Sequence, residues 1–465
     1  MFEFNINDEN YSHIHFIGIG GISMSGLAEI LLSKNFTVSG SDIKENNILS
    51  RLEGLGAKIY IGQVGENLEE DVDLVIYTDA IRDDNDELKT ARAREIKTID
   101  RATFLGALMR NYKQSIAVSG THGKTTTTSI LSTILSHSQI DPTILLGGQL
   151  KEIGGNVKLG KKDCLLTEAC EYKGNILKYF PSIAIIMNMD EDHLDYFKSI
   201  DHIVDTFAVF ASNIEEDGYL IINGDDINKD RVIEATGAKV LSFGLEGNPS
   251  YKAENIEYLE GSSKFDLYYQ GEFVDNFTVN IIGRHNIYNS LAAIAGAHTF
   301  GLSLDFIKEN IAMYTGVGRR LEFKGFYKGI KVLDDYAHHP TEINVTLKAL
   351  KESIKSRGEI YCIFQPHTFT RTQKLFNNFA QAFKYADHVV ITDIYAAREL
   401  DDGSVHSQDL VAAIDNTDAI YLEGFSDIKD FILKEAVEND IVITMGAGNI
   451  FELGEEIVAG ELRAI

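Results

Sequence analysis

Short apolar runs alternate with amphipathic segments along most of the 465-residue chain. Glycine or polar residues bound these runs, and apolar positions at helical spacing follow many of them. This rhythm predicts buried parallel strands joined by crossover helices, and therefore an α/β fold. The predicted strands cover residues 13–17, 36–40, 59–61, 74–77, 96–99, 115–119, 164–167, 183–187, 219–223, 239–243, 331–334, 360–364, 389–393 and 441–445.

Two changes in the pattern predict domain boundaries. A polar segment at 109–114 interrupts the rhythm, and residues 251–282 instead alternate in a way that indicates a small β-rich part. Helices are predicted at about 27–34 and 290–300. The chain length suits two to four domains. We therefore predict a doubly wound domain over 1–111, a central domain with a parallel sheet and the β-rich part over 112–321, and another α/β domain over 322–465.

The segment from Ser115 to Thr128, SIAVSGTHGKTTTT, has the layout of a phosphate-binding loop between a strand and a helix. Glycines let backbone N–H groups approach phosphate oxygens, and the helix N-terminus favours an anion. Lys124 would add a positive charge and Thr125 a hydroxyl for Mg²⁺. Two residues separate Gly120 from Gly123, whereas the common loop has four. Binding of a nucleoside triphosphate is the hypothesis, and a coincidental strand-to-helix connection is the alternative.

Polar residues follow two other strands of the central domain. Glu168 ends one strand, and Asp190-Glu-Asp-His193 follows another. The carboxyl ends of parallel strands meet at one edge, where ligands bind in open α/β sheets. Glu168 is therefore a candidate Mg²⁺ ligand, with a solvated strand-end acid as the alternative. His193 alone would more often be a structural histidine, but together with Lys124 and Thr125 it favours a site.

The first predicted strand is followed by Gly18-Ile-Gly20-Gly21-Ile-Ser23. Ser23 stands where a dinucleotide-binding fingerprint has its third glycine, and Asp42 ends the next strand. This variant favours a phosphate-bearing nucleotide over NAD(P). In the last domain, every strand runs into a loop rich in His, Arg, Asp or Gly. At the start of the helix predicted over 290–300, His285, Asn286 and Asn289 could face a flat heterocycle or act as caps.

Composition narrows the class of partner. The net charge is −27, which disfavours nucleic acid and anionic membranes and means that an anionic substrate needs local basic groups. The N-terminus lacks the features of a signal peptide, and no apolar stretch approaches the ~18 residues of a membrane span. The cysteines, Cys164, Cys170 and Cys362, form neither a metal-ligand nor a disulfide pattern. A cytoplasmic protein is expected.

Eight stretches, taken in chain order, resemble the Mur ligases of peptidoglycan synthesis: HFIGIGGISMSGLAEIL, GTHGKTTTT, DEDH, GRHNIYN, GVGRRLEFKG, DDYAHHPTE, FQPHTFTRT and MGAGNI. The resemblance covers nearly the whole chain, and the shortened phosphate loop is the form that this family uses. It implies a Rossmann-like N-terminal domain for a UDP-sugar, a central P-loop-type ATPase domain and a Rossmann-like C-terminal domain for an amino acid. It also implies that ATP drives the joining of L-alanine to the lactyl carboxylate of UDP-N-acetylmuramate through an acyl phosphate. A monomer or weak homodimer is expected.

The resemblance implies roles for individual residues. Those expected to bind ATP are Gly120, Thr121, His122, Gly123, Lys124, Thr125, Thr126, His285, Asn286, Asn289, Arg320 and Asp335. Those expected to bind the UDP-sugar diphosphate are Gly18, Gly20, Gly21 and Ser23. Those expected around the amino acid are Tyr336, His338, His367 and Arg371. The expected Mg²⁺ ligands are Thr125, Glu168 and His193, and the expected catalytic residues are Lys124, His193 and Arg371.

A few positions depart from the commonest family pattern. Cys170 stands where many members have Asp, Thr368 where many have Arg, Gln63 where His is frequent, and Thr78-Asp79 where Ser-Ser is frequent. The alternatives are a recycling ligase that attaches a tripeptide to the same UDP-sugar, and a non-catalytic nucleotide-sensing protein. Intact Lys124 argues against the latter. An NAD-dependent oxidoreductase would leave the phosphate loop unexplained, and folylpolyglutamate synthase lacks such an N-terminal domain.

Overall fold

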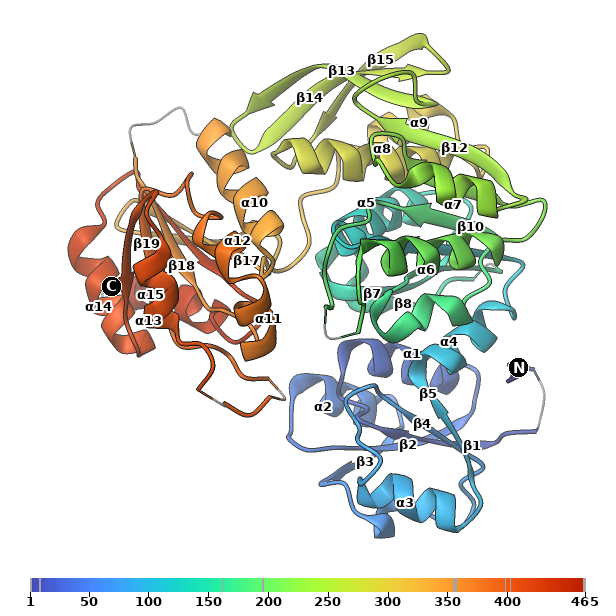
Figure 1. Cartoon of the computed structure of the whole chain (residues 1–465). Helices are drawn as coiled ribbons and strands as arrows, with labels where there is room; N and C mark the ends of the chain where they lie inside the picture. Colours follow the sequence, from blue (N-terminus) through green and yellow to red (C-terminus); the bar gives the residue numbers. More distant parts are fainter. Residues whose placement is uncertain are drawn as a thin grey trace. The chain divides into compact units, whose positions relative to one another are not determined.

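The computed structural model describes residues 2–7, 10–161, 163–194, 196–353, 358–397, 399–401 and 403–462. The chain forms two compact units, each described by itself below (Figure 1). The first comprises Met1–Met189, Asp201–Phe243 and Ala292–Ile307. The second comprises Asp190–Ile200, Gly244–Leu291 and Lys308–Ile465.

The N-terminal part of the first unit is a parallel sheet with strand order β3-β2-β1-β4-β5. The order reverses beside β1, which is where ligands bind in doubly wound sheets. The strands are β1 (His13–Ile17), β2 (Thr37–Asp42), β3 (Lys58–Ile61), β4 (Leu74–Tyr77) and β5 (Lys97–Asp100). The helices are α1 (Ile22–Ser33), α2 (Asn47–Gly54), α3 (Asp86–Ala93) and α4 (Arg101–Met109), with the 3₁₀ turn η1 at Gly65–Asn67.

Helix α1 begins at Ile22, earlier than the predicted start near Leu27. Gly21 occupies its N-cap, and the hydroxyl of Ser25 donates to the carbonyl of Ile22, so the small polar residues belong to the helix. Gly26 lies inside the helix, where a Cβ atom would come within 2.7 Å of Leu145 and 3.0 Å of Val157. This glycine is therefore explained by the close packing of α1 against β7 and β8 (Figure 1).

The rest of the first unit contains the predicted parallel sheet, in the order β12-β11-β10-β6-β9-β7. The seventh strand of this part, β8, pairs antiparallel with β7, and neither β7 nor β8 was predicted. The strands are β6 (Gln114–Ser119), β7 (Thr143–Leu150), β8 (Gly155–Lys158), β9 (Cys164–Glu168), β10 (Ile183–Ile186), β11 (Tyr219–Asn223) and β12 (Lys239–Gly244). The helices are α5 (Lys124–Ser136), α6 (Ile200–Ser212) and α7 (Lys229–Ala235), with 3₁₀ turns η2 (Lys151–Ile153) and η3 (Tyr172–Lys178).

The second unit contains the predicted β-rich part, a meander of three antiparallel strands. These are β13 (Tyr251–Leu259), β14 (Ser262–Tyr269) and β15 (Glu272–Val279). Helix α8 (Arg284–His298) follows and begins six residues before the predicted start at Ser290. Its polar first turn hid the start of the helix. The division between the units passes through α8 and through α9 (Leu304–Ile311).

The C-terminal sheet has the order β16-β17-β21-β18-β19-β20, parallel except for β16. Its strands are β16 (Glu322–Tyr327), β17 (Ile330–Asp335), β18 (Ile360–Phe364), β19 (His388–Ile391), β20 (Asp418–Tyr421) and β21 (Ile441–Met445). Its helices are α10 (Pro340–Ser353), α11 (Phe369–Lys374), α12 (Phe376–Ala380), α13 (Ser407–Ala413), α14 (Phe425–Glu435) and α15 (Phe451–Leu462).

Alternate strand residues of this sheet enter two different cores. Cys362 packs with Leu347 of α10, whereas the next residue, Ile363, packs with Ile432 of α14. Helices therefore cover both faces, as a doubly wound domain requires. The predicted class, α/β with three sheet-containing domains, is confirmed. Within the described residues, no helix combines the length and apolar character needed to cross a membrane.

Candidate functional site

The phosphate loop, Gly120–Thr125, connects β6 to α5 as the sequence predicts. Gly120 has a φ of +128°, and a Cβ there would come within 3.0 Å of the backbone nitrogen of Asn188. The backbone N–H of Thr121 donates to the Asn188 carbonyl (3.0 Å), and that of His122 donates to its side-chain oxygen (2.8 Å). The Asn188 amide returns a bond to the His122 carbonyl (3.1 Å). Asn188, two residues after the end of β10, therefore fixes the loop.

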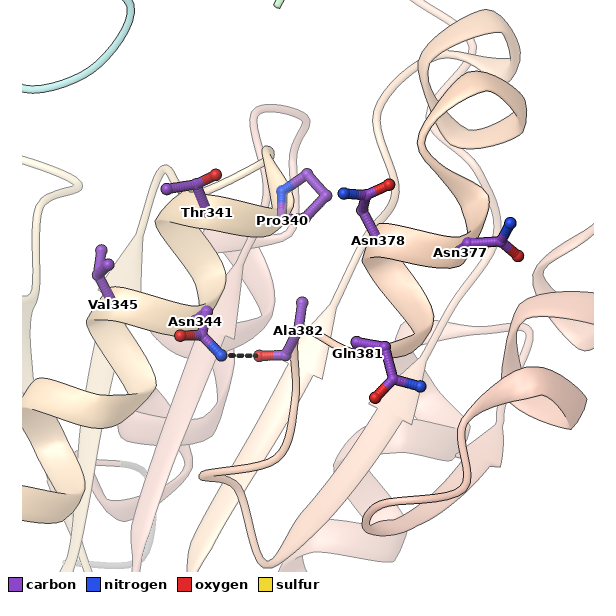
Figure 2. A pocket seen from close by; sticks show the side chains of 8 residues that line it. All are labelled: Pro340, Thr341, Asn344, Val345, Asn377, Asn378, Gln381 and Ala382. Carbon is purple, nitrogen blue, oxygen red and sulfur yellow. Dashed lines mark hydrogen bonds between the residues drawn. The ribbon is translucent and has the colours of Figure 1, made fainter. Parts of the chain in front are cut away.

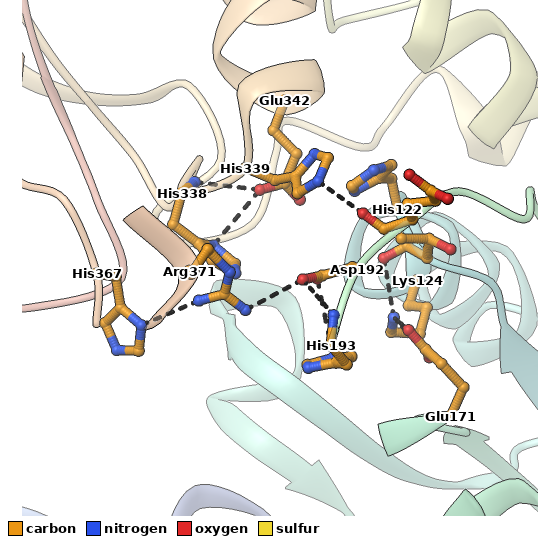
Figure 3. Close-up of polar contacts among 12 residues, drawn as sticks. His122, Lys124, Glu171, Asp192, His193, His338, His339, Glu342, His367 and Arg371 are labelled. Atoms are coloured by element: carbon orange, nitrogen blue, oxygen red, sulfur yellow. Dashed lines mark hydrogen bonds and ion pairs between the residues drawn. The ribbon is translucent and has the colours of Figure 1, made fainter. Parts of the chain in front are cut away.

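Lys124 lies at the first position of α5 and is paired within the unit (Figure 3). Its Nζ donates to the Thr121 carbonyl (3.0 Å), to the Gly120 carbonyl and to Glu171 Oε2 (3.1 Å). Burial alone would lower the pKa of Lys124, but the Glu171 carboxylate outweighs it and raises the pKa above its usual value. Lys124 is therefore charged, and its charge is matched by an acid that the sequence pattern did not single out.

Thr125 and Glu168 lie together, as predicted. The Thr125 hydroxyl donates to Glu168 Oε2 (2.9 Å), and the Gly147 backbone N–H holds the other carboxylate oxygen (2.7 Å). A hydroxyl and a fixed carboxylate are the hard oxygen ligands that Mg²⁺ takes, so these residues fit the ion. His193, the third metal candidate, belongs to the second unit.

The glycine loop, Gly18–Ser23, follows β1. Gly18 has a φ of +85°, and Gly21 caps α1. The Gly20 N–H donates to the Asp42 carboxylate (2.9 Å), and a Cβ at Gly20 would lie 2.8 Å from that oxygen. Asp42 therefore orders the loop and occupies one of its N–H donors.

Arg101, the first residue of α4, was missed by the sequence reasoning. Its guanidinium donates to the Ser23 hydroxyl (3.1 Å), and within the described residues no carboxylate lies at ion-pair distance from it. Tyr179 and Cys170 are close by, but burial raises the pKa of both, to about 11 for Cys170, so both are neutral at pH 7. Against the opposing effect of burial, the Asp79 carboxylate also acts on Arg101 and raises its pKa, and a buried cation beside a glycine loop suits an anionic ligand. The signal available in the sequence was an arginine directly after a strand end.

In the second unit, the candidate ATP residues lie near the start of α10. Each oxygen of the buried Asp335 carboxylate accepts a backbone N–H, from Leu321 and from Ala337 (2.8 Å each). Burial raises the pKa of Asp335 to about 6, against the opposing effect of Arg320. Arg320 lies 3.7 Å from Glu342 and 5.2 Å from the Tyr336 ring centre.

The polar residues in the first turn of α8 have divided roles. Asn286 donates from its backbone to the Gly283 carbonyl (3.0 Å) and from its side chain to the Ile282 carbonyl (2.8 Å). Its amide oxygen accepts from Asn289 (2.8 Å). These bonds favour the structural alternative for Asn286. His285 remains a candidate for a heterocycle, since burial, and then Arg320, lower its pKa to about 4 and keep its ring neutral.

The candidate amino-acid residues form a polar group in the second unit (Figure 3). Arg371 bonds to His367 Nδ1 (3.2 Å) and to Asp192 (3.3 Å). His338 donates from Nδ1 to the Tyr336 carbonyl (3.0 Å), and burial lowers its pKa to about 3, so its Nε2 is an acceptor. Burial opposes the charge of Asp192, but His193 and Arg371 keep its pKa below the usual range.

Two further features of this unit lie outside the predicted set. His339, beside His338, is buried and donates to the Glu191 carbonyl (3.1 Å), which indicates a structural role. A pocket of about 500 Å³ lies between α10 and α12 (Figure 2). Its lining is Pro340, Thr341, Asn344, Val345, Asn377, Asn378, Gln381 and Ala382. None of these is a predicted site residue, so this pocket does not identify the chemistry.

Family comparisons match nearly the whole chain. Residues 13–113 match "Mur ligase family, catalytic domain", residues 118–297 match "Mur ligase middle domain", and residues 319–448 match "Mur ligase, glutamate ligase domain". The UDP-N-acetylmuramate–L-alanine ligase of Alkaliphilus metalliredigens is 46% identical over 461 residues, covering 99% of this chain and 100% of the relative. That of Acetivibrio thermocellus is 48% identical over 460 residues, covering 98% and 97%.

Solved structures give the same likeness. The UDP-N-acetylmuramate-alanine ligase MurC from Thermotoga maritima superposes with a TM-score of 0.83 at 28% identity, covering 97% of this chain and 100% of that one. A murein peptide ligase, mpl, from Psychrobacter arcticus superposes with a TM-score of 0.72 at 26% identity, covering 96% and 98%.

Proposed function

Since this chain belongs to the Mur ligase family, we propose that it joins L-alanine to the lactyl carboxylate of UDP-N-acetylmuramate, with ATP converted to ADP and phosphate, in peptidoglycan synthesis. The observation that carries the proposal is the 46–48% identity over nearly the full length of ligases with this activity. We also propose the domains 1–111, 112–321 and 322–465 for the UDP-sugar, ATP and the amino acid, in a monomer or weak homodimer.

The reaction needs activation because a carboxylate is a poor acyl donor. A lactyl carboxylate oxygen attacks the γ-phosphorus of ATP, ADP leaves, and an acyl phosphate forms. The alanine amine, after losing a proton, attacks the acyl carbon, and phosphate leaves from the tetrahedral intermediate. Most of the catalysis is therefore positioning of the reactants and neutralisation of their charge.

The phosphate loop would neutralise the transferring phosphoryl group. Lys124 would leave Glu171 and bind the β- and γ-phosphates of ATP. It would then stay bound to the γ-phosphoryl group as this group is transferred to form the acyl phosphate. The fit of Thr125 and Glu168 supports one Mg²⁺ there, and His193 is the candidate ligand of a second ion. When bound, the ion supplies positive charge to the phosphates.

The remaining substrates would meet the other candidate residues. The diphosphate of the UDP-sugar would lie on Gly18, Gly20, Gly21 and Ser23. The adenosine would contact His285, Asn289 and Asp335, with Arg320 reaching its phosphates. Arg371 and the acceptor nitrogen of neutral His338 suit the carboxylate and the ammonium of alanine, beside Tyr336 and His367.

A substrate-omission assay tests the proposal. The purified protein is incubated with ATP, Mg²⁺ and UDP-N-acetylmuramate, together with L-alanine, glycine, L-serine or the tripeptide used by recycling ligases, and phosphate release is measured. We expect release that needs all components and is fastest with L-alanine. Release with the tripeptide alone would establish the recycling activity instead, and no release with any acceptor would refute ligation.

A further inference from the structure

The loop after β19 places Tyr395 beside the candidate amino-acid residues. The backbone N–H of Tyr395 donates to the Pro366 carbonyl (2.8 Å), and its carbonyl accepts from Thr368 (2.9 Å). These two bonds form a parallel bridge between Tyr395 and His367. The position of Tyr395 is therefore tied to the segment that carries His367 and Arg371.

The Tyr395 ring is held from two sides. It stacks on the His367 imidazole, with ring centres 5.7 Å apart and planes inclined by 17°. On another side lies Gly448, where a Cβ would come within 2.7 Å of the Tyr395 ring and 2.3 Å of Gln365 Oε1. Gly448 therefore lets the backbone after β21 support the ring directly. A side chain that is 39% exposed is thus also fixed in place.

The backbone beside this ring is strained. Thr368 has φ +67° and ψ 142°, a region that β-branched residues rarely adopt and that costs about 1–3 kcal/mol. The bond to the Tyr395 carbonyl and a bond from the Thr372 hydroxyl to the Thr368 carbonyl (2.7 Å) hold it there. Strain of this kind is kept where the surrounding structure fixes a functional geometry.

The two tyrosines of the group differ in what their faces contact. Tyr336 has the guanidinium groups of Arg319 and Arg320 over its ring, at 4.9 and 5.2 Å. Tyr395 has an exposed apolar surface, and its hydroxyl bonds to none of the described residues. Arg371 and His338 are suited to the charged groups of an amino acid, whereas the Tyr395 ring is suited to its apolar side chain.

We propose that the Tyr395 ring, supported by Gly448, limits the size of the side chain that the amino-acid substrate can carry. This inference rests on the proposed ligase function. A rigid aromatic surface beside the groups that fix the ammonium and carboxylate would contact a methyl group and exclude a longer side chain. One methylene in such a pocket is worth roughly 10–200-fold in kcat/KM.

Two substitutions should shift the selectivity in opposite directions. Tyr395→Ala removes the ring, so the ratio of kcat/KM for L-alanine over L-2-aminobutyrate should fall by roughly 10-fold or more. Gly448→Ala pushes the ring towards the substrate, so the ratio of glycine over L-alanine should rise. The wild-type protein is assayed first, since absence of alanine-dependent phosphate release there would refute the ligase function itself.

Two further variants separate the ring from general damage. Tyr395→Phe keeps the ring and should keep the wild-type selectivity ratio. Phe326→Ala removes an aromatic side chain that is 54% exposed on β16 and should leave the rates with both substrates unchanged. If Tyr395→Ala fails to fold, Gly448→Ala decides the question. Unchanged ratios in an active Tyr395→Ala or Gly448→Ala variant would overturn the size-limiting role and leave the ligase function standing.

Discussion

The groups around the Lys124 ammonium prepare the phosphate loop for an anionic ligand. This ammonium is matched by Glu171 and by two carbonyls of its own loop. A positive charge at the start of α5 adds to the field of the helix terminus, which favours phosphate. The loop is therefore organised before any nucleotide arrives.

Replacing Lys124 with Ala should abolish most of the turnover. Loss of one preorganised donor to a developing charge typically costs 10²–10³ in kcat, and a full positive charge should cost at least about that much. Phosphate release measures the loss, and circular dichroism checks the fold. Lys113→Ala, at an exposed lysine just before β6, is the matched control and should keep its activity. Near-normal turnover of the Lys124 variant would contradict the site assignment.

His285 predicts a pH dependence of stability. Burial lowers its pKa to about 4, so the folded chain keeps it neutral while the unfolded chain takes up a proton near pH 6.5. The stabilisation is present above pH 6.5 and is lost as the pH falls towards 4, by up to about 1.4 kcal/mol per pH unit. His285→Gln should flatten this slope, as measured by urea unfolding at pH 7, 6 and 5.

Asp335 acts in the opposite sense. Its pKa is raised from 3.8 to about 6 in the folded chain. Its contribution to the free energy of unfolding is therefore fully present below pH 3.8 and is lost as the pH rises through 6. The wild-type protein and the His285→Gln variant both carry Asp335. The difference between their slopes of unfolding free energy against pH therefore isolates His285. Equal slopes would show that His285 is protonated as readily in the folded chain as in the unfolded one.

At the scale of elements, a buried polar contact between His15 and Glu87 joins β1 to α3. His15 Nε2 lies 3.4 Å from Glu87 Oε1, and both side chains are fully buried. Glu87 also accepts from Asn67 (2.7 Å) and from Ser41, while His15 Nδ1 meets Ser39 (2.9 Å). This network fixes the packing of α3 on the sheet that carries the glycine loop.

Removing one partner of the contact between His15 and Glu87 should destabilise the fold more than replacing both partners. Glu87→Ala leaves His15 and two donors without their acceptor, and should lower the free energy of unfolding by about 3–5 kcal/mol. The double variant His15→Leu, Glu87→Leu should recover part of that loss. Denaturant midpoints measure both. Asp83→Ala breaks the exposed contact with Arg92 and should change stability by less than about 1 kcal/mol.

The elements that could be predicted were those whose own residues carry the signal. β6, β11 and β18 are apolar runs with sharp polar borders, and the structure has them where the pattern placed them. β7 contains two adjacent glycines, which interrupt the apolar run, and its antiparallel partner β8 is only four residues long. The early starts of α1 and α8 were missed because their first turns carry polar residues and directly follow a glycine, so that they resemble loops until packing selects the helix.

At the scale of the whole molecule, the charge of −27 opposes every anionic substrate. Raising NaCl from about 10 to about 150 mM shortens the screening length from about 30 to about 8 Å. We expect kcat/KM for the UDP-sugar to rise over this range, because long-range repulsion weakens more than contacts inside the site. Steady-state kinetics at constant free Mg²⁺ measure it. A steady fall would show that local cations such as Lys124 dominate the approach.

The candidate site could be predicted only in part, because only some of its residues lie in a local sequence pattern. Lys124, Thr125 and Glu168 lie in local patterns with a known chemistry, and the structure brings the last two into contact. Asn188 and Arg101 carry no such pattern. Each acts on a loop far away in the sequence, 66 positions in one case and 78 in the other, so the fold alone brings them to it.

The packing of α1 on β7 and β8 has a consequence for which molecules the chain can accept. The absence of a side chain at Gly26 permits this contact, and a bond from Asn156 to Ile22 (2.6 Å) adds to it. A bond from Lys178 to Asp100 (2.8 Å) also joins η3 to the end of β5. The glycine loop and the phosphate loop therefore belong to one unit, and their separation is set before anything binds. If the glycine loop holds the UDP-sugar diphosphate, as proposed, a substrate whose two anionic ends are too close or too far apart would reach only one of these loops. Length, as well as chemistry, becomes a criterion of selection.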